Sequence, residues 1–152
     1  MKALPRWLQA LLSIVALLLI LLIASRFSEK APIYAEGSIS ISPQLAAKAE
    51  EQRNLFIVVF DQNSPGPMPY GALRVQLDAA PHGTFHHFIL TRENLSVMAG
   101  KQNGELDKMR IKARLSSSGF IGQNSQGDLY GEITDISLAA QGLHIVIDKA
   151  RE

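Results

Sequence analysis

The chain has 152 residues, a formal net charge of +1 and no cysteine. The positive excess lies in the first thirty residues, because the remaining 122 carry 11 basic and 13 acidic side chains. A domain with this slight negative charge lacks the basic footprint of a nucleic-acid-binding protein. The absence of cysteine excludes disulfides, thiol redox chemistry, cysteine-type zinc sites and a lipid-anchored lipoprotein.

Residues 7–24 form an apolar run that only Gln9 and Ser13 interrupt. As a helix with a rise of about 1.5 Å per residue, the run spans roughly 27 Å, close to the thickness of a bilayer's hydrocarbon core. Basic residues precede it, which predicts a cytoplasmic tip at residues 1–6, one transmembrane helix in a bacterial inner membrane, and a domain in the periplasm. The alternative is a cleaved signal peptide, but its best cleavage site, after Ser25, has a bulky residue two positions earlier.

A polar linker is predicted at residues 25–35, followed by a β-rich domain at residues 36–152. Residues 37–41 alternate polar and apolar side chains, which is typical of a half-buried strand. Ser42 and Pro43 then provide the N-cap and the first position of a short helix of two to three turns.

The domain's remaining predicted strands are apolar or alternating runs bounded by glycine- or proline-rich turns. They lie at residues 55–60, 72–77, 85–90, 108–115, 129–138 and 143–147. The expected fold is mainly β: an antiparallel β-sandwich or barrel-like domain of about seven strands with one or two short helices, preceded by the transmembrane helix.

The segment at residues 63–69 contains three prolines, and it cannot form a helix or a central strand because proline lacks an amide donor. Two interpretations stay open. The segment is either a plain rigid connection or a preorganised display surface, which would lose little entropy on binding. The candidate partner-binding residues of this loop are Pro67, Met68, Pro69 and Tyr70.

The strand at residues 108–115 has basic side chains at every even position and apolar side chains at every odd position. Lys108, Arg110, Lys112 and Arg114 therefore share one face at a spacing of about 6.6 Å. This basic ladder is either a surface for an acidic partner segment or a haem propionate, or a solvated face neutralised by Asp128 and Glu132. Arg110, Lys112 and Arg114 are its candidate partner-binding residues, and Arg114 is the one most expected to contact a partner.

Catalytic and metal-binding motifs are not found. Residues 122–127 have the wrong spacing for a nucleophile elbow, and the chain has neither a phosphate-binding glycine loop nor a His-Glu-x-x-His helix. His86 and His87 are neighbours in a predicted strand, so they point to opposite faces and cannot bind one ion. We expect no enzyme, no metal and no cofactor, with contact of one histidine to haem left open.

Three blocks of residues are the most specific in the chain: Gly-Pro-Met-Pro at 66–69, Ala-Arg-Leu-Ser-Ser-Ser-Gly at 113–119, and Gly-Asp-Leu-Tyr-Gly-Glu at 127–132. Together with residues 40–43 and 55–58, they resemble one family over about residues 36–148. This family is the C-terminal periplasmic domain of the cytochrome c maturation (system I) chaperone, which handles apocytochrome c before haem ligation.

In that family the domain follows tetratricopeptide repeats, which are credited with gripping apocytochrome c. Neither these repeats nor a second transmembrane helix is recognisable in this sequence. The resemblance implies a non-catalytic chaperone or assembly factor for c-type cytochrome biogenesis, whose protein partners are apocytochrome c or other maturation components. The alternative is an accessory structural subunit of a respiratory membrane complex that contains cytochromes.

Overall fold

The structure is a computed structural model that describes residues 14–16, 18–19, 32–63, 68–98, 106–120 and 125–152. The chain divides into two units, Met1–Ala31 and Pro32–Glu152. In the first unit, residues 14–16 and 18–19 are helical, and the rest of the predicted transmembrane helix at 7–24 lies outside the described residues, as does the tip at 1–6. Among the described residues, no helix combines the length and the apolar character needed to cross a membrane.

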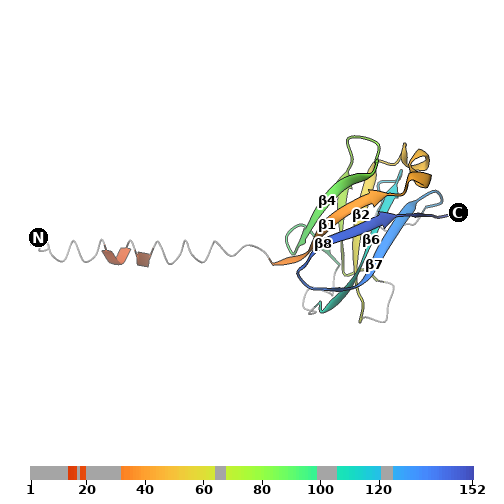
Figure 1. Cartoon of the computed structure of the whole chain (residues 1–152). Coiled ribbons are helices and arrows are strands. Elements are labelled where there is room, and N and C mark those ends of the chain that lie inside the picture. Colours follow the sequence, from red (N-terminus) through yellow and green to blue (C-terminus); the bar gives the residue numbers. More distant parts are fainter. Residues whose placement is uncertain (1–13, 17, 20–31, 64–67, 99–105, 121–124) are drawn as a thin grey trace, which may run out of the picture. The chain divides into compact units, whose positions relative to one another are not determined.

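The second unit contains a three-stranded sheet with the order β4-β1-β8 (Figure 1). Its strands are β1 (Ile33–Ile41), β4 (Thr84–Thr91) and β8 (Ala140–Ile147). β1 begins before its predicted start and takes in the end of the predicted linker. It is antiparallel to β4 but parallel to β8, so the prediction of a purely antiparallel fold was wrong for this pair. The alternation of polar and apolar side chains within a strand does not show whether two strands about a hundred residues apart in the chain pair in parallel or antiparallel.

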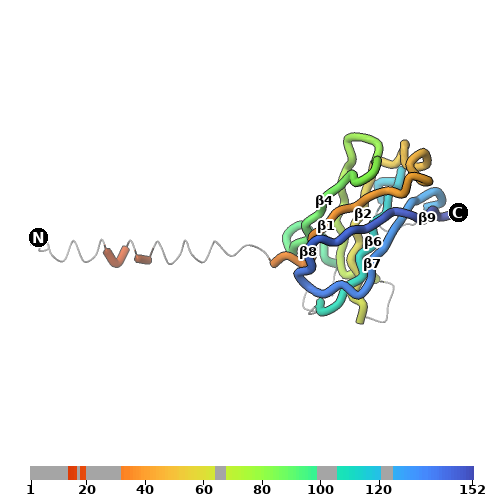
Figure 2. Tube along the Cα trace, in the orientation of Figure 1, coloured from red at the N-terminus to blue at the C-terminus, as the bar shows by residue number. Residues whose placement is uncertain are grey.

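The second sheet has six strands in the order β5-β3-β2-β6-β7-β9, and every adjacent pair is antiparallel. The strands are β2 (Asn54–Asp61), β3 (Gly71–Gln76), β5 (Ser96–Val97), β6 (Lys108–Ser116), β7 (Leu129–Ser137) and β9 (Lys149–Ala150). The two-residue strands β5 and β9 were not predicted. β9 follows β8 almost directly, so the end of the chain passes from the small sheet to the large one (Figure 2).

The core fills the space between the two sheets. Fully buried aliphatic side chains come from β1, β2, β6 and β8, and they include Ile39, Leu55, Ile57, Val59, Ile111, Leu115, Ile145 and Ile147. Val75, Phe85 and Ile133 are partly buried against this cluster. Burial of these side chains is the main favourable term in folding, at about 25 cal/mol per Å² of apolar surface. The odd positions of β6 pack inward, as the alternation in its sequence predicts.

The predicted helix after Ser42 is replaced by two 3₁₀ turns, η1 (Pro43–Leu45) and η2 (Ala47–Ala49). Ser42 is the N-cap residue and Pro43 follows it as predicted, but the Ser42 side chain caps no backbone amide and instead contacts Gln44. A helix this short gains little from its few hydrogen bonds, and Glu50 at its end opposes the helix dipole. The segment therefore forms tighter single turns.

Gly131 of β7 allows the two sheets to approach each other on one side of the sandwich. A Cβ atom at this position would lie 1.9 Å from the carbonyl oxygen of Val146 in β8. No side chain other than hydrogen fits there, so β7 lies directly against β8 although the two strands belong to different sheets. This contact covers the side of β8 that faces away from β1.

Candidate functional site

The basic ladder lies on the outer face of the six-stranded sheet, where residues opposite each other in register share a face. Phe56 of β2 is opposite both Arg74 of β3 and Arg114 of β6, and Arg114 is opposite Tyr130 of β7. Lys149 of β9 continues this row beside Tyr130. We call this surface the basic face; the residues that define it are Phe56, Phe60, Arg74, Lys108, Arg110, Lys112, Arg114, Tyr130, Glu132 and Lys149.

Three of the four ladder cations lie over aromatic rings of neighbouring strands. The charged groups of Arg110 and Lys112 are 4.3 Å and 4.4 Å from the ring centroids of Phe60 and Tyr130. Arg114 lies 4.8 Å from the ring centroid of Phe56. Each contact of this kind is worth about 0.5–2 kcal/mol, depending on its exposure. The aromatic residues of β2 and β7 thus hold the ladder in place.

The acidic residues that were predicted to neutralise the ladder are close to it. Glu132 lies 3.8 Å from Arg110, and Asp128 lies 3.4 Å from Arg114. Lys108 pairs at 2.7 Å with Asp135, which was not predicted. The Lys108 pair is exposed and the Arg110 pair is partly exposed, so water and salt screen both of them and they contribute little to stability. Much of the charge on this face is therefore balanced within the domain.

Lys112 differs from the other ladder residues because no carboxylate lies within ion-pair distance of it among the described residues. Burial lowers the pKa of its ammonium group, Glu132 opposes that shift, and the cation of Arg114 adds to it. Lys112 and Arg110 both remain partly exposed. Lys108 is more exposed than either of them, but it is paired with Asp135.

Arg114 differs from the prediction, which placed it in contact with a partner. Its side chain and that of Asp128 are each only 3% exposed. Arg114 donates a hydrogen bond to the carbonyl oxygen of Phe120 at 2.9 Å, and Asp128 accepts one from the backbone N–H of Ser125 at 2.8 Å. Burial lowers the pKa of Arg114 and Asp128 opposes that shift. The pair thus connects β6 to the start of β7 inside the domain.

The proline-rich loop also differs from the prediction. Met68 is 59% exposed and Pro69 is half-buried, whereas Pro67 lies outside the described residues. Tyr70 is buried rather than displayed, and its hydroxyl lies 3.5 Å from that of Tyr34. Burial, followed by this hydrogen bond, raises the pKa of Tyr70 to about 12. Tyr70 belongs to the core cluster and lies directly before the start of β3.

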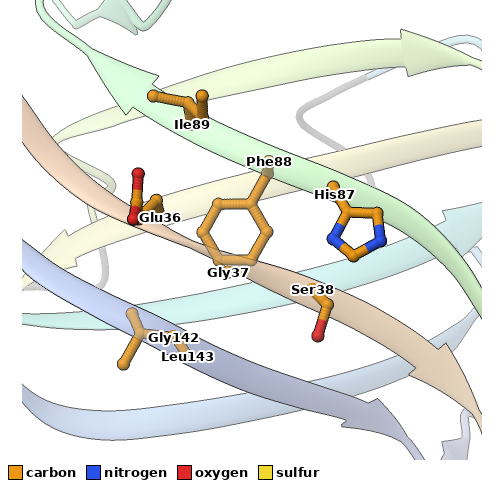
Figure 3. A pocket seen from close by; sticks show the side chains of 8 residues that line it. All are labelled: Glu36, Gly37, Ser38, His87, Phe88, Ile89, Gly142 and Leu143. Carbon is orange, nitrogen blue, oxygen red and sulfur yellow. The ribbon is translucent and has the colours of Figure 1, made fainter.

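The outer face of the small sheet carries a hollow of about 370 Å³. Figure 3 shows Glu36 and Ser38 of β1, His87 and Ile89 of β4 and Leu143 of β8 around it. Beside it, the two ring nitrogens of His144 lie 2.9 Å and 3.0 Å from the hydroxyls of Ser38 and Ser40. Sequence reasoning missed this contact, because the parallel pairing of β1 with β8 creates it.

His86 and His87 occupy successive positions of β4, where side chains alternate between the two faces of the sheet. Burial, followed by the charge of His87, lowers the pKa of His86. Within the described residues, no group of three or more histidine, aspartate or glutamate side chains is placed to hold a metal ion.

These features define a two-sheet β-sandwich of the immunoglobulin-like class, in which strands present side chains on open sheet faces and edges. A model of the cytochrome c-type biogenesis protein H Ig-like domain family matches residues 36–148. The chain belongs to this family, which confirms the resemblance seen in the sequence and places the protein in c-type cytochrome biogenesis. Neither a curated protein nor a solved structure shows significant similarity to the chain.

Proposed function

We propose that the protein is a non-catalytic, membrane-anchored chaperone or assembly factor whose domain works in the periplasm during the maturation of c-type cytochromes. The observation that carries this proposal is the family match, which extends from β1 to the residue after β8 and so includes nearly the whole domain. The role in cytochrome biogenesis therefore belongs to the domain itself.

The sequence supports the membrane anchor. Residues 7–24 are long and apolar enough for one transmembrane helix, and the basic residues before them favour a cytoplasmic N-terminus. A domain held in this way stays at the membrane surface, where it meets membrane-bound partners at a high effective concentration.

The arrangement of charged groups supports a binding role without catalysis. The carboxylates of Asp128, Glu132 and Asp135 are each engaged with a cation of the ladder. These carboxylates serve the packing of a sheet face.

We assign two partly exposed cations of the basic face, Arg110 and Lys112, to an acidic segment of a maturation component. A guanidinium group and an ammonium group on adjacent outward positions match two carboxylates of an extended chain. Met68 provides an exposed apolar contact in the proline-rich loop.

Deletion of the gene tests the function. Loss of haem-attached c-type cytochromes is the expected result. Normal cytochromes, together with the protein as a stoichiometric band in a purified respiratory complex, would instead support the accessory subunit.

The double variant Arg110→Glu/Lys112→Glu tests the basic face by co-purification of partners in mild detergent. We expect recovery of partners to fall several-fold, because the reversed charges repel an acidic segment. Lys48→Glu/Arg92→Glu is the matched control, since it reverses two exposed cations outside β6. Equal recovery with both variants would remove the assignment.

A further inference from the structure

Strand β4 forms a long open edge of the sandwich. Among the described residues it pairs only with β1, and its other side has no partner strand. The other edges differ from it: β5 and β9 each pair with two residues at the margins of the large sheet and leave the rest of β3 and β7 unpaired there, and β8 lies against β7 at Gly131. β4 lies at the margin of the domain beside β1 (Figure 1). At the C-terminal end of β4 the Asn94 side chain occupies part of the side without a partner strand, because it donates to the carbonyl oxygen of Ile89 and accepts from the backbone N–H of Thr91. The preceding residues of β4 present unpaired backbone groups along this side.

The composition of β4 does not protect this edge. Natural sheets block pairing at their edges with lysine, proline, bulges or very short strands. β4 reads Thr-Phe-His-His-Phe-Ile-Leu-Thr, with no proline, no glycine and no lysine, arginine or carboxylate. The irregularities in its pairing with β1 lie toward the two ends of the ladder, near Ile33 and Ser40. The central part of β4 is thus a regular and uncharged template for another strand.

A groove lined by both apolar and polar side chains, with Asp78 and His82 among the polar ones, adjoins the first residues of β4. It has a volume of about 470 Å³ and lies between β4 and the end of β3 with the turn that follows it. Val75, Leu77 and Phe85 line it and are only partly buried against the core. Farther along β4, Ile89 is 52% exposed at the hollow shown in Figure 3. A strand added to β4 would find apolar surface at both ends of the edge.

We infer that the open edge of β4 binds an extended, uncharged segment of a partner polypeptide, which adds as a fourth strand to the small sheet. Backbone hydrogen bonds would provide the affinity, and the groove and Ile89 would select apolar side chains at alternate positions. A charged segment would find no complementary ion on β4, so the neutrality of the edge favours a neutral partner. This inference rests on the proposed function, which provides a polypeptide that has not yet folded around its cofactor.

Hydrogen–deuterium exchange of the full chain in mild detergent tests the inference. The probe is a haem-free cytochrome c polypeptide with its cysteines blocked. Without the probe, we expect roughly half of the amides of β4 to exchange quickly, because alternate residues face away from β1. With saturating probe, these amides should become protected. Protection of other segments while β4 is unchanged would overturn the inference, as would protection of β4 that depends on protein concentration alone and indicates a second copy.

The variant Ile89→Lys places a positive charge on the edge, as natural edge strands do to prevent pairing with another strand. We expect it to bind the probe roughly tenfold more weakly, since the lysine must lose solvation beside an apolar segment. Val146→Lys is the matched control: Val146 is 40% exposed on β8, whose free side is covered by β7. His87→Lys, at another exposed position of β4, repeats the test if Ile89→Lys unfolds the domain.

Failure of this inference is distinguishable from failure of the proposed function. If deletion abolishes mature cytochromes while Ile89→Lys restores them fully and binds the probe normally, the strand edge is wrong and the function stands. If deletion leaves cytochromes intact, the proposed function is wrong, whatever the probe does.

Discussion

Replacement of Arg114 by methionine tests whether the most specific sequence block of the domain serves its stability. The substitution keeps most of the side-chain volume but removes the positive charge next to Asp128. That carboxylate is 3% exposed and keeps only the backbone N–H of Ser125 among the contacts described above. The carbonyl oxygen of Phe120 also loses its donor. The variant therefore leaves an uncompensated charge inside the domain.

The expected loss is large relative to the total stability. Removing one partner of a buried ion pair costs about 3–5 kcal/mol, whereas a domain of this size is stable by about 5–15 kcal/mol. Lys112→Met is the matched control, because it lies on the same face of the same strand but is partly exposed. We expect that variant to lose about 1 kcal/mol or less, from its contact with Tyr130.

Urea unfolding of the full chain in mild detergent, followed by circular dichroism, measures both free energies. The double variant Arg114→Met/Asp128→Leu completes the cycle and should be more stable than Arg114→Met alone, since it removes the stranded carboxylate. A loss below about 1 kcal/mol for Arg114→Met, equal to that of Lys112→Met, would refute the reasoning, because the pair would then behave like an exposed contact.

Two further predictions concern Tyr70 and Gly131, whose places in the fold only the structure shows. The pKa of Tyr70 is raised from 10.0 to about 12, so its contribution to stability is complete below pH 10 and is lost as the pH rises toward 12. The free energy of unfolding should therefore be lower at pH 11 than at pH 9. This difference should be smaller in the variant Tyr70→Phe. Gly131→Ala should destabilise the domain by about 3 kcal/mol, because its Cβ atom meets the Val146 backbone. Gly142→Ala, with open space but φ +67°, should lose only about 1 kcal/mol, and equal thermal shifts for the two variants would contradict this account.

The strands that alternate clearly were predictable from the sequence, and β6 is the best case. Its odd positions are apolar because they face the core, and its even positions are basic because they face the neighbours on the outer side of the sheet. The neighbours Asp128 and Glu132 were predictable because β7 is the next strand in the chain. The local period of apolar and polar residues thus shows which side chains of a strand face the core.

Alternation could not show which of four equivalent cations is buried. Arg114 is buried because Phe120 and Asp128 meet it from another loop and another strand, and only the tertiary structure brings them together. The parallel pairing of β1 with β8 and the contact of His144 with two serines likewise depend on the tertiary structure. The sequence predicts Tyr70 on the surface of the proline-rich loop, because a proline-rich segment gives no sign of where the loop ends and the core begins.

The position of the sequence blocks helps to separate the fold from the binding surface. The blocks at 113–119 and 127–132 contain the two members of the buried ion pair, Arg114 and Asp128, so both blocks preserve an internal contact. Partly exposed Arg110 and Lys112 lie just before the first block, and exposed Ile89 lies on β4, away from both. A partner that recognises this domain must contact exposed groups. The binding surface is therefore expected at the exposed cations and at the open edge of β4, where variants can change the choice of partner without unfolding the sandwich.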